Sequence, residues 1–418
     1  MTMLQMVAVI IAFTTLFTVI NYKVFKLPHA IGVMLGALVM SLGIQALTFM
    51  GYPVVEQTAV ELISAIDFHQ LLMTWILPAL LFAGCLTVNV SDLKQHKWAI
   101  AGLATLGVVI ATAVIGFSTY FVLHAIGLDV NLMYCLLFGA LISPTDPIAV
   151  MGILKNAGAP DNLRVTIVGE SLFNDGTAIV VFTVLLTLIT VGGTPSIGEV
   201  GLLFAQEAVG GVIYGALLGL STVYILKGIH EAHIAGMVTI VMVFGGATLA
   251  SLIHVSSPLA IVVAGLCLGY KPFAHMSDYT HKVVNNFWHL IDEFLNGVLF
   301  AIIGLELLIV QFNLLHVVVA LSLFVVLIMS RMLTVLPPMA IMSKFTGNKM
   351  PNGSALLLAW GGLRGGVSIA LVLALPAGPA KDVLLPLTYV IVLGSILLQG
   401  LTVGKLVELL FPPKNDPA

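Results

Sequence analysis

The sequence predicts an all-α polytopic membrane protein, and two of its properties point to this class. Of its 418 residues, 60% are hydrophobic and only 8% are charged. Soluble domains carry about 25% charged residues, so this composition excludes a water-soluble enzyme, a nucleic-acid-binding protein and a disordered chain. The apolar runs are long and continuous rather than alternating, which favours transmembrane helices over a β-barrel.

Thirteen stretches are apolar enough to cross a bilayer as helices, which takes about 20 residues each. The ninth is short and borders the eighth, so twelve spans remain an alternative. No stretch suggests a soluble regulatory domain, and the chain 1–418 is expected to form a single transporter domain. The predicted spans are 3–22, 30–50, 69–88, 98–124, 131–154, 165–190, 199–226, 234–254, 257–270, 285–310, 315–341, 353–376 and 383–411.

The basic residues support thirteen spans and predict their orientation. The loops alternate between the two sides of the membrane. The loops of one side, together with the C-terminal tail, hold twelve basic residues, whereas the loops of the other side hold only Lys381. Cytoplasmic loops are enriched in Lys and Arg, so we expect an outside N-terminus and a cytoplasmic C-terminus in the cell (inner) membrane. The cytoplasmic set is Lys23, Lys26, Lys94, Lys97, Lys155, Arg164, Lys227, Lys271, Lys282, Lys344, Lys349 and Lys414.

Glu207, Asp292, Glu293, Glu306 and Glu408 lie near span ends, and five ionisable residues remain deep inside predicted spans. Such residues are costly in a bilayer and usually have a function. They are Asp146, Glu170, Asp175, Arg331 and Arg364. No specific role for Arg331 follows from the sequence.

The sixth span places its two carboxylates on different faces. Ser171 and Asp175 are four residues apart and share a helix face, and so do Glu170 and Asn174. Glu170 and Asp175 are separated by five residues, which turns them about 140° apart around the helix. The two carboxylates are therefore expected to meet different neighbours.

The fifth span contains Ser143-Pro144-Thr145-Asp146-Pro147 near its middle. Each proline removes a backbone donor and clashes with the preceding turn, so the helix is expected to break between Pro144 and Pro147. Unwound backbone at membrane depth survives where it lines a cavity. Free carbonyls there, with the carboxylate of Asp146, would suit a small hard cation.

The twelfth span is also predicted to break, at the glycine-rich stretch 361–366 that contains Arg364. Alternatively, these glycines form a close-packing face. The two interrupted spans, the fifth and the twelfth, are the middle members of two three-span units, spans 4–6 and 11–13. Interrupted spans at corresponding places of two units are typical of inverted-repeat transporters, in which the broken helices cross. Asp146 and Arg364 would then compensate the opposite dipole ends of the half-helices.

Four segments resemble sodium/proton antiporters of the NhaP/NHE type. They are GALISPTDPIAV, GESLFNDGTAIVVF, FLNGVLFAIIGLEL and WGGLRGGVSIALVLALP. The resemblance implies a core domain at about 69–190 and 315–411 that carries the ion site. It also implies scaffold helices at about 1–50 and 199–310 that form a homodimer, and an elevator-type movement of the core.

The resemblance also assigns roles to individual residues. Asp175 would be the carboxylate for which Na⁺ (or Li⁺) and H⁺ compete. Asn174 stands where electrogenic relatives carry a second Asp, which implies electroneutral one-for-one exchange. The remaining assignments are a sodium site completed by Asp146, Ser171 and the carbonyl of Thr145, a structural charge pair of Glu170 with Arg364, and supporting prolines Pro144 and Pro147.

One departure from the family pattern concerns the ion preference. Relatives often carry a Glu beside the ion path where this chain has Ala83. K⁺/H⁺ antiport therefore stays an alternative, and a passive cation channel is a more distant one. The sequence shows no enzyme signature, and we expect no cofactor. The expected partners are a monovalent cation, a proton, the lipid bilayer and a second copy of the chain, and no nucleic acid.

Overall fold

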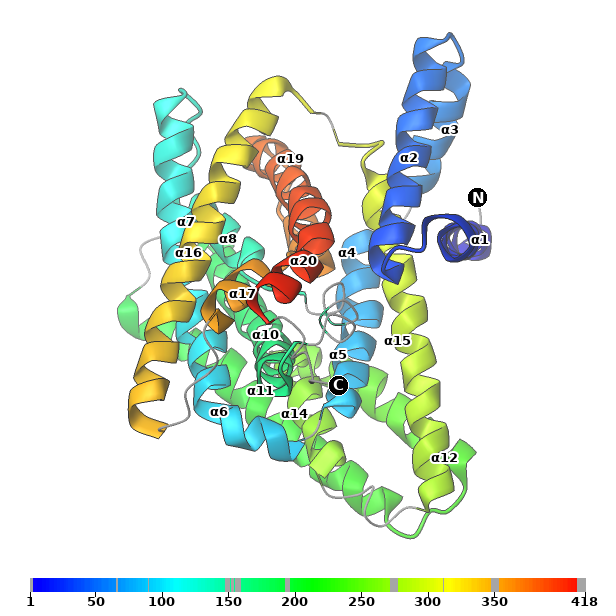
Figure 1. Ribbon diagram of the computed structural model, residues 1–418, viewed down its shortest axis with the longest axis vertical. Coiled ribbons are helices and arrows are strands. Elements are labelled where there is room, and N and C mark those ends of the chain that lie inside the picture. Colours follow the sequence, from blue (N-terminus) through cyan, green and yellow to red (C-terminus); the bar gives the residue numbers. More distant parts are fainter. Residues whose placement is uncertain are drawn as a thin grey trace, which may run out of the picture.

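The protein is helical throughout the part of the chain that the computed structural model describes, which comprises residues 3–64, 67–88, 90–146, 151, 154, 159–191, 196–270, 277–310, 312–346 and 353–411. In these residues, ten helical segments are long and apolar enough to cross a membrane, and two more apolar helices are shorter. A broken pair, α17 (Ser354–Trp360) and α18 (Gly366–Leu373), corresponds to the twelfth predicted span, 353–376. The predicted fold class is confirmed (Figure 1).

The first half of the chain follows the predicted spans with two differences. A short helix, α3, follows the second span, and a break at Thr105 divides the predicted span 98–124 between two helices. Short π-helical segments continue the first span and open the third. The bounds are α1 Met3–Ile20, η1 Asn21–Phe25, α2 His29–Phe49, α3 Pro53–Ser64, α4 Phe68–Gln70, η2 Leu71–Ile76, α5 Leu77–Thr87, α6 Val90–Ala104, α7 Leu106–Ala125 and α8 Leu132–Ile142.

The second half contains the long helix α10, which carries the predicted ion site, and the broken twelfth span. A π-helical segment, η5, interrupts the last span beside that break. The bounds are α10 Asp161–Val191, α11 Ile197–Leu226, α12 Ala232–Ile240, η3 Val241–Gly245, α13 Gly246–Leu252, α14 Ser257–Tyr270, α15 Asp278–Glu306, α16 Leu314–Thr346, α19 Pro379–Gly394, η5 Ser395–Gln399 and α20 Gly400–Leu410.

The two interrupted spans meet at their breaks, as the sequence predicts. The helix α8 ends at Ile142, and α17 ends at Trp360. Between the breaks, the backbone N–H of Asp146 donates to the carbonyl of Leu363 at 2.8 Å, which forms an isolated antiparallel bridge. Pro147, which follows this bridge, lies outside the described residues.

Small residues allow the helices around these breaks to pack closely. A Cβ on Gly139 of α8 would clash with the backbone of Thr112 on α7, and one on Gly116 would clash with Leu136. Glycine at such points lets helix backbones approach in a membrane bundle. In Figure 1, α8, α10 and α17 lie in the middle of the molecule, with α16 on one side and α2 and α15 on the other.

Candidate ion site

The helix α10 places its polar residues on two faces, as its spacing predicts. Ser171 and Asp175 line a cavity of about 1030 Å³. Glu170 and Asn174, both 1% exposed, face a packed interior instead. The face that Ser171 and Asp175 share is therefore open to water and ions, whereas the other is sealed by neighbouring helices.

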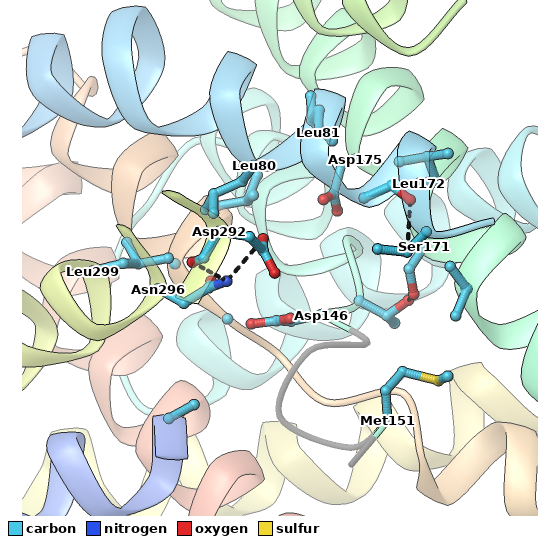
Figure 2. A pocket seen from close by; sticks show the side chains of 18 of the residues that line it. Leu80, Leu81, Asp146, Met151, Ser171, Leu172, Asp175, Asp292, Asn296 and Leu299 are labelled. Carbon is cyan, nitrogen blue, oxygen red and sulfur yellow. Dashed lines mark hydrogen bonds between the residues drawn. The ribbon is translucent and has the colours of Figure 1, made fainter. Parts of the chain in front are cut away.

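The cavity brings together oxygen-bearing residues from two separated parts of the chain. The unwound segment after α8 contributes Pro144, Thr145 and Asp146, and α10 contributes Ser171 and Asp175. Figure 2 shows the carboxylates of Asp146 and Asp175 directed toward the same space. Two carboxylates, hydroxyls and unwound carbonyls are the oxygen ligands that a small hard cation prefers.

Thr145 links the unwound segment to α10. Its Oγ1 lies 3.0 Å from the hydroxyl oxygen of Ser171, and the amide Nδ2 of Asn174 donates to the same Oγ1 at 2.7 Å. The Asn174 amide also donates to Glu170 Oε1 at 3.2 Å. These bonds fix the distance between the segment that carries Asp146 and the helix that carries Asp175.

The predicted charge pair of Glu170 with Arg364 is wrong. Glu170 instead accepts two hydrogen bonds from Arg331 of α16, from Nη1 at 2.6 Å and from Nη2 at 2.5 Å. Both side chains are buried. Gly362 makes room for this arginine, because a Cβ there would lie 2.9 Å from Arg331 Nε. Arg331, which had no role in the sequence interpretation, thus neutralises the buried carboxylate.

Arg364 serves the broken helices. Its Nη1 donates to the carbonyls of Ser143 and Pro144, the latter at 2.9 Å, just past the C-terminal end of α8. Its backbone N–H donates to the hydroxyl of Ser395 in η5 at 3.0 Å. A cation at a helix C-terminus stabilises the partial negative charge of the unbonded carbonyls. This is the dipole compensation that the sequence predicts for Arg364.

Asp146 occupies the complementary position at the other break. Its carboxylate lies against Gly365, immediately before α18, where any Cβ would collide with it. The first turn of a helix favours a negative charge. Glycine at position 365 therefore lets the carboxylate of Asp146 reach the start of α18. The backbone of Asp146 meanwhile forms the bridge to Leu363.

Three polar residues near the site had no role in the sequence interpretation, although Asp292 is among the ionisable residues near span ends. On α15, Asp292 and Asn296 line the same cavity as Asp146 and Asp175. The signal was present, because His289, Asp292, Glu293 and Asn296 follow the i, i+3, i+4, i+7 spacing of one helix face. In η5, Gln399 accepts a hydrogen bond from Ser395 at 2.5 Å.

The site is not a protein cage for a metal ion. Among the described residues, no three His, Cys, Asp or Glu side chains are grouped closely enough to hold one. A cation here would therefore be held by two carboxylates together with hydroxyl, carbonyl and water oxygens.

Comparison with known proteins places this architecture in a family. Residues 9–409 match the model of the sodium/hydrogen exchanger transmembrane family. The chain belongs to the sodium/hydrogen exchanger family. It is 53% identical over 412 residues to the Na⁺/H⁺ antiporter NhaP of Pseudomonas aeruginosa, covering 98% of this chain and 97% of that protein. The predicted family resemblance is confirmed.

More distant relatives agree. The chain is 31% identical to the Na⁺/H⁺ antiporter NhaH of Halobacillus dabanensis over 92% of its length and 93% of the relative's. Among solved structures, the sodium proton antiporter MjNhaP1 from Methanocaldococcus jannaschii at pH 8 matches with a TM-score of 0.74 and 22% identity. That match covers 96% of this chain and 97% of the other, and it shows that the fold is shared along the whole chain.

Proposed function

We propose that this protein is a secondary active antiporter that exchanges Na⁺ for H⁺ across the cell membrane. The observation that carries the proposal is the division of charge on α10. Asp175 faces the cavity beside Asp146, while the neighbouring carboxylate, Glu170, is neutralised by Arg331. The names of the relatives support sodium as the cation.

Exchange follows from competition at this carboxylate. Asp175 holds either a proton or a cation, with Asp146, Ser171 and Thr145 supplying further oxygens. Both loaded states reduce the charge that must cross the membrane, whereas the empty carboxylates are penalised by the bilayer. Only loaded states then cross readily, so that uptake of one ion is coupled to release of the other. Li⁺, a smaller hard cation, is expected to use the same site.

The stoichiometry that fits the site is one cation for one proton. The residue before Asp175 is Asn174, and its amide is engaged by Thr145 and Glu170. It adds no titratable charge to the site. With Glu170 bonded to Arg331, the α10 helix offers one exchangeable charge, which supports electroneutral exchange.

The cavity supports alternating access. Its lining includes Lys26, Asp92 and Arg164, which lie by loops that the positive-inside rule assigns to the cytoplasm. In this orientation, the site is open to the cytoplasm, with the N-terminus outside. We propose that the core helices, about 69–190 and 315–411, carry the site across in an elevator-type movement against a scaffold that joins two copies of the chain.

The decisive experiment is proton movement in everted membrane vesicles that carry a proton gradient. Addition of Na⁺ is expected to dissipate the gradient with the wild-type protein and not with Asp175→Asn. Glu408→Gln removes an exposed acid outside the cavity and should transport normally. Retained Na⁺-dependent proton movement in Asp175→Asn would refute the assignment of the site.

The same vesicles separate the remaining alternatives. K⁺ in place of Na⁺ tests K⁺/H⁺ exchange, and Li⁺ tests the range of accepted cations. A passive cation channel would conduct Na⁺ without moving protons against their gradient. Proton movement driven by an imposed Na⁺ gradient excludes that channel.

A further inference from the structure

We propose that Asp292 on α15 is a third carboxylate of the ion site, which raises the affinity of the site for the cation entering through the cavity. The proposal rests on the antiport function given above. It assigns an affinity-setting role to a helix that supplies neither Asp146 nor Asp175.

The position of Asp292 gives the first support. Its side chain lines the same cavity as Asp146 and Asp175. Figure 2 shows its carboxylate directed into the space between those two residues. Asp292 and Asp146 are close enough to interact electrostatically. A cation moving through the cavity to Asp175 therefore passes into the field of all three carboxylates.

Asn296, one turn along α15, holds this carboxylate in place. Its Nδ2 donates to Asp292 Oδ1 at 3.1 Å and to the backbone oxygen of Asp292 at 2.9 Å. Asn296 is only 2% exposed, and its own Oδ1 has no hydrogen-bond partner among the described residues. Burying an amide oxygen without a hydrogen-bond partner is costly, so stability alone does not explain Asn296 at this position.

The depth of Asp292 is set by the packing of α15 against the N-terminal helices. At Gly297, a Cβ would lie 3.0 Å from Thr14 Cγ2 and 3.1 Å from His29 Nε2. The helix therefore approaches α1 and α2 closely at this level. Asp292 therefore reaches the cavity from α15, which packs with α1 and α2, whereas Asp146 and Asp175 reach it from the segment after α8 and from α10.

The electrostatic effect works across space rather than through direct coordination. Among the residues that the structure describes, no three acidic, His or Cys side chains are close enough to hold one ion together. Charges nonetheless interact over several ångströms where water is partly excluded, and an acidic cavity concentrates cations. A third negative charge should thus lower the Na⁺ concentration needed for half-maximal transport.

The test is a Na⁺ titration of proton movement in everted vesicles, which present the cytoplasmic face. Asp292→Asn keeps the shape of the side chain and removes its charge. We expect the half-saturating Na⁺ concentration to rise about tenfold, with the maximal rate reduced less than twofold. Asp278→Asn is the matched control, because it removes an exposed charge from the first turn of the same helix, outside the cavity. Solvent screening should keep its shift below about twofold.

Two further variants keep the proposal testable. Asp292→Glu retains the charge and should recover most of the Na⁺ affinity, and Asp292→Ser should reproduce the loss even if Asp292→Asn folds poorly. A wild-type half-saturating concentration in folded Asp292→Asn or Asp292→Ser would overturn the proposal. So would a lower maximal rate at unchanged half-saturation, which would indicate a structural role alone. Failure of the antiport proposal itself looks different, because the wild-type protein would then show no Na⁺-dependent proton movement.

Discussion

Two faces of α10 each carry a carboxylate, and the surroundings of the two differ. Asp175 lies on the wall of a cavity of about 1030 Å³, one turn from Ser171. Glu170 is 1% exposed and is held by both terminal nitrogens of Arg331. Five residues of helix, about 140° of rotation, separate a carboxylate on a cavity wall from one fixed in an ion pair.

The difference shows how a helix keeps one acid available inside a membrane. A buried charge without a partner costs several kcal/mol, so Glu170 persists because Arg331 and Asn174 bond to it. Asp175 instead faces the cavity, where water or, in the proposed function, a transported ion would stabilise it. We therefore expect substitutions on the packed face to lower stability, and substitutions on the cavity face to alter transport.

The largest effect on stability is expected for Arg331→Met. Removing one partner of a buried ion pair leaves Glu170 charged and unpaired, which costs about 3–5 kcal/mol of unfolding free energy. The midpoint of thermal unfolding in detergent should fall clearly below that of the wild-type protein. The double variant Glu170→Gln with Arg331→Met removes the stranded charge and should regain most of the loss. An unchanged midpoint in Arg331→Met would contradict the pairing.

A smaller loss, about 2 kcal/mol, is expected for Arg364→Met. This change removes charge-assisted hydrogen bonds to the carbonyls of Ser143 and Pro144 beyond α8. Unfolding in detergent measures it in the same way. Here Glu170→Gln should give no recovery, because Glu170 is bonded to the other arginine. Recovery would mean that Arg364, not Arg331, neutralises Glu170.

The two arginines also show where sequence reasoning stops. The spacing of Glu170 and Asp175 within one helix predicts their opposite faces, and the Pro and Gly runs predict both breaks, because these are local rules. Which arginine meets Glu170 depends on where the bundle places α16 relative to α10, because the two residues are 161 positions apart. Nothing in the local sequence around Arg331 specifies that packing.

Asp292 illustrates a different kind of miss. The polar face of α15 was visible as a repeat at helical spacing. The sequence does not reveal the surroundings of this face, because tertiary packing decides whether it meets loops, lipid or a cavity. Only the packing of α15 beside α2 and α5 turns Asp292 toward the ion site. The positions of the helices and of their breaks could thus be predicted from the sequence. The side-chain contacts between helices that are distant in the sequence could not.

A loss of about 1 kcal/mol is expected for Ser395→Ala. Its hydroxyl accepts the backbone N–H of Arg364 and donates to Gln399, so it positions the unwound stretch between α17 and α18. Thr388→Val is the control, because that buried hydroxyl bonds to Leu384 within its own helix. Na⁺ titrations should show a raised half-saturating concentration for Ser395→Ala and not for Thr388→Val. Ser395→Thr should restore the affinity, and equal behaviour of the first two variants would reduce Ser395 to a packing role.

The smallest effect on stability is expected on the cavity face, for Ser171→Ala. Ser171 borders the cavity, and Thr145 keeps its bond from Asn174 when the Ser171 hydroxyl is removed, so the unfolding free energy should change by no more than about 0.5 kcal/mol. Transport should change more, because an oxygen beside Asp175 is lost. We expect a several-fold rise in the half-saturating Na⁺ concentration, measured in everted vesicles. If Ser171→Ala instead destabilised the protein as much as Arg331→Met while leaving the Na⁺ affinity unchanged, the separation of the two faces of α10 into an ion-binding side and a structural side would be wrong.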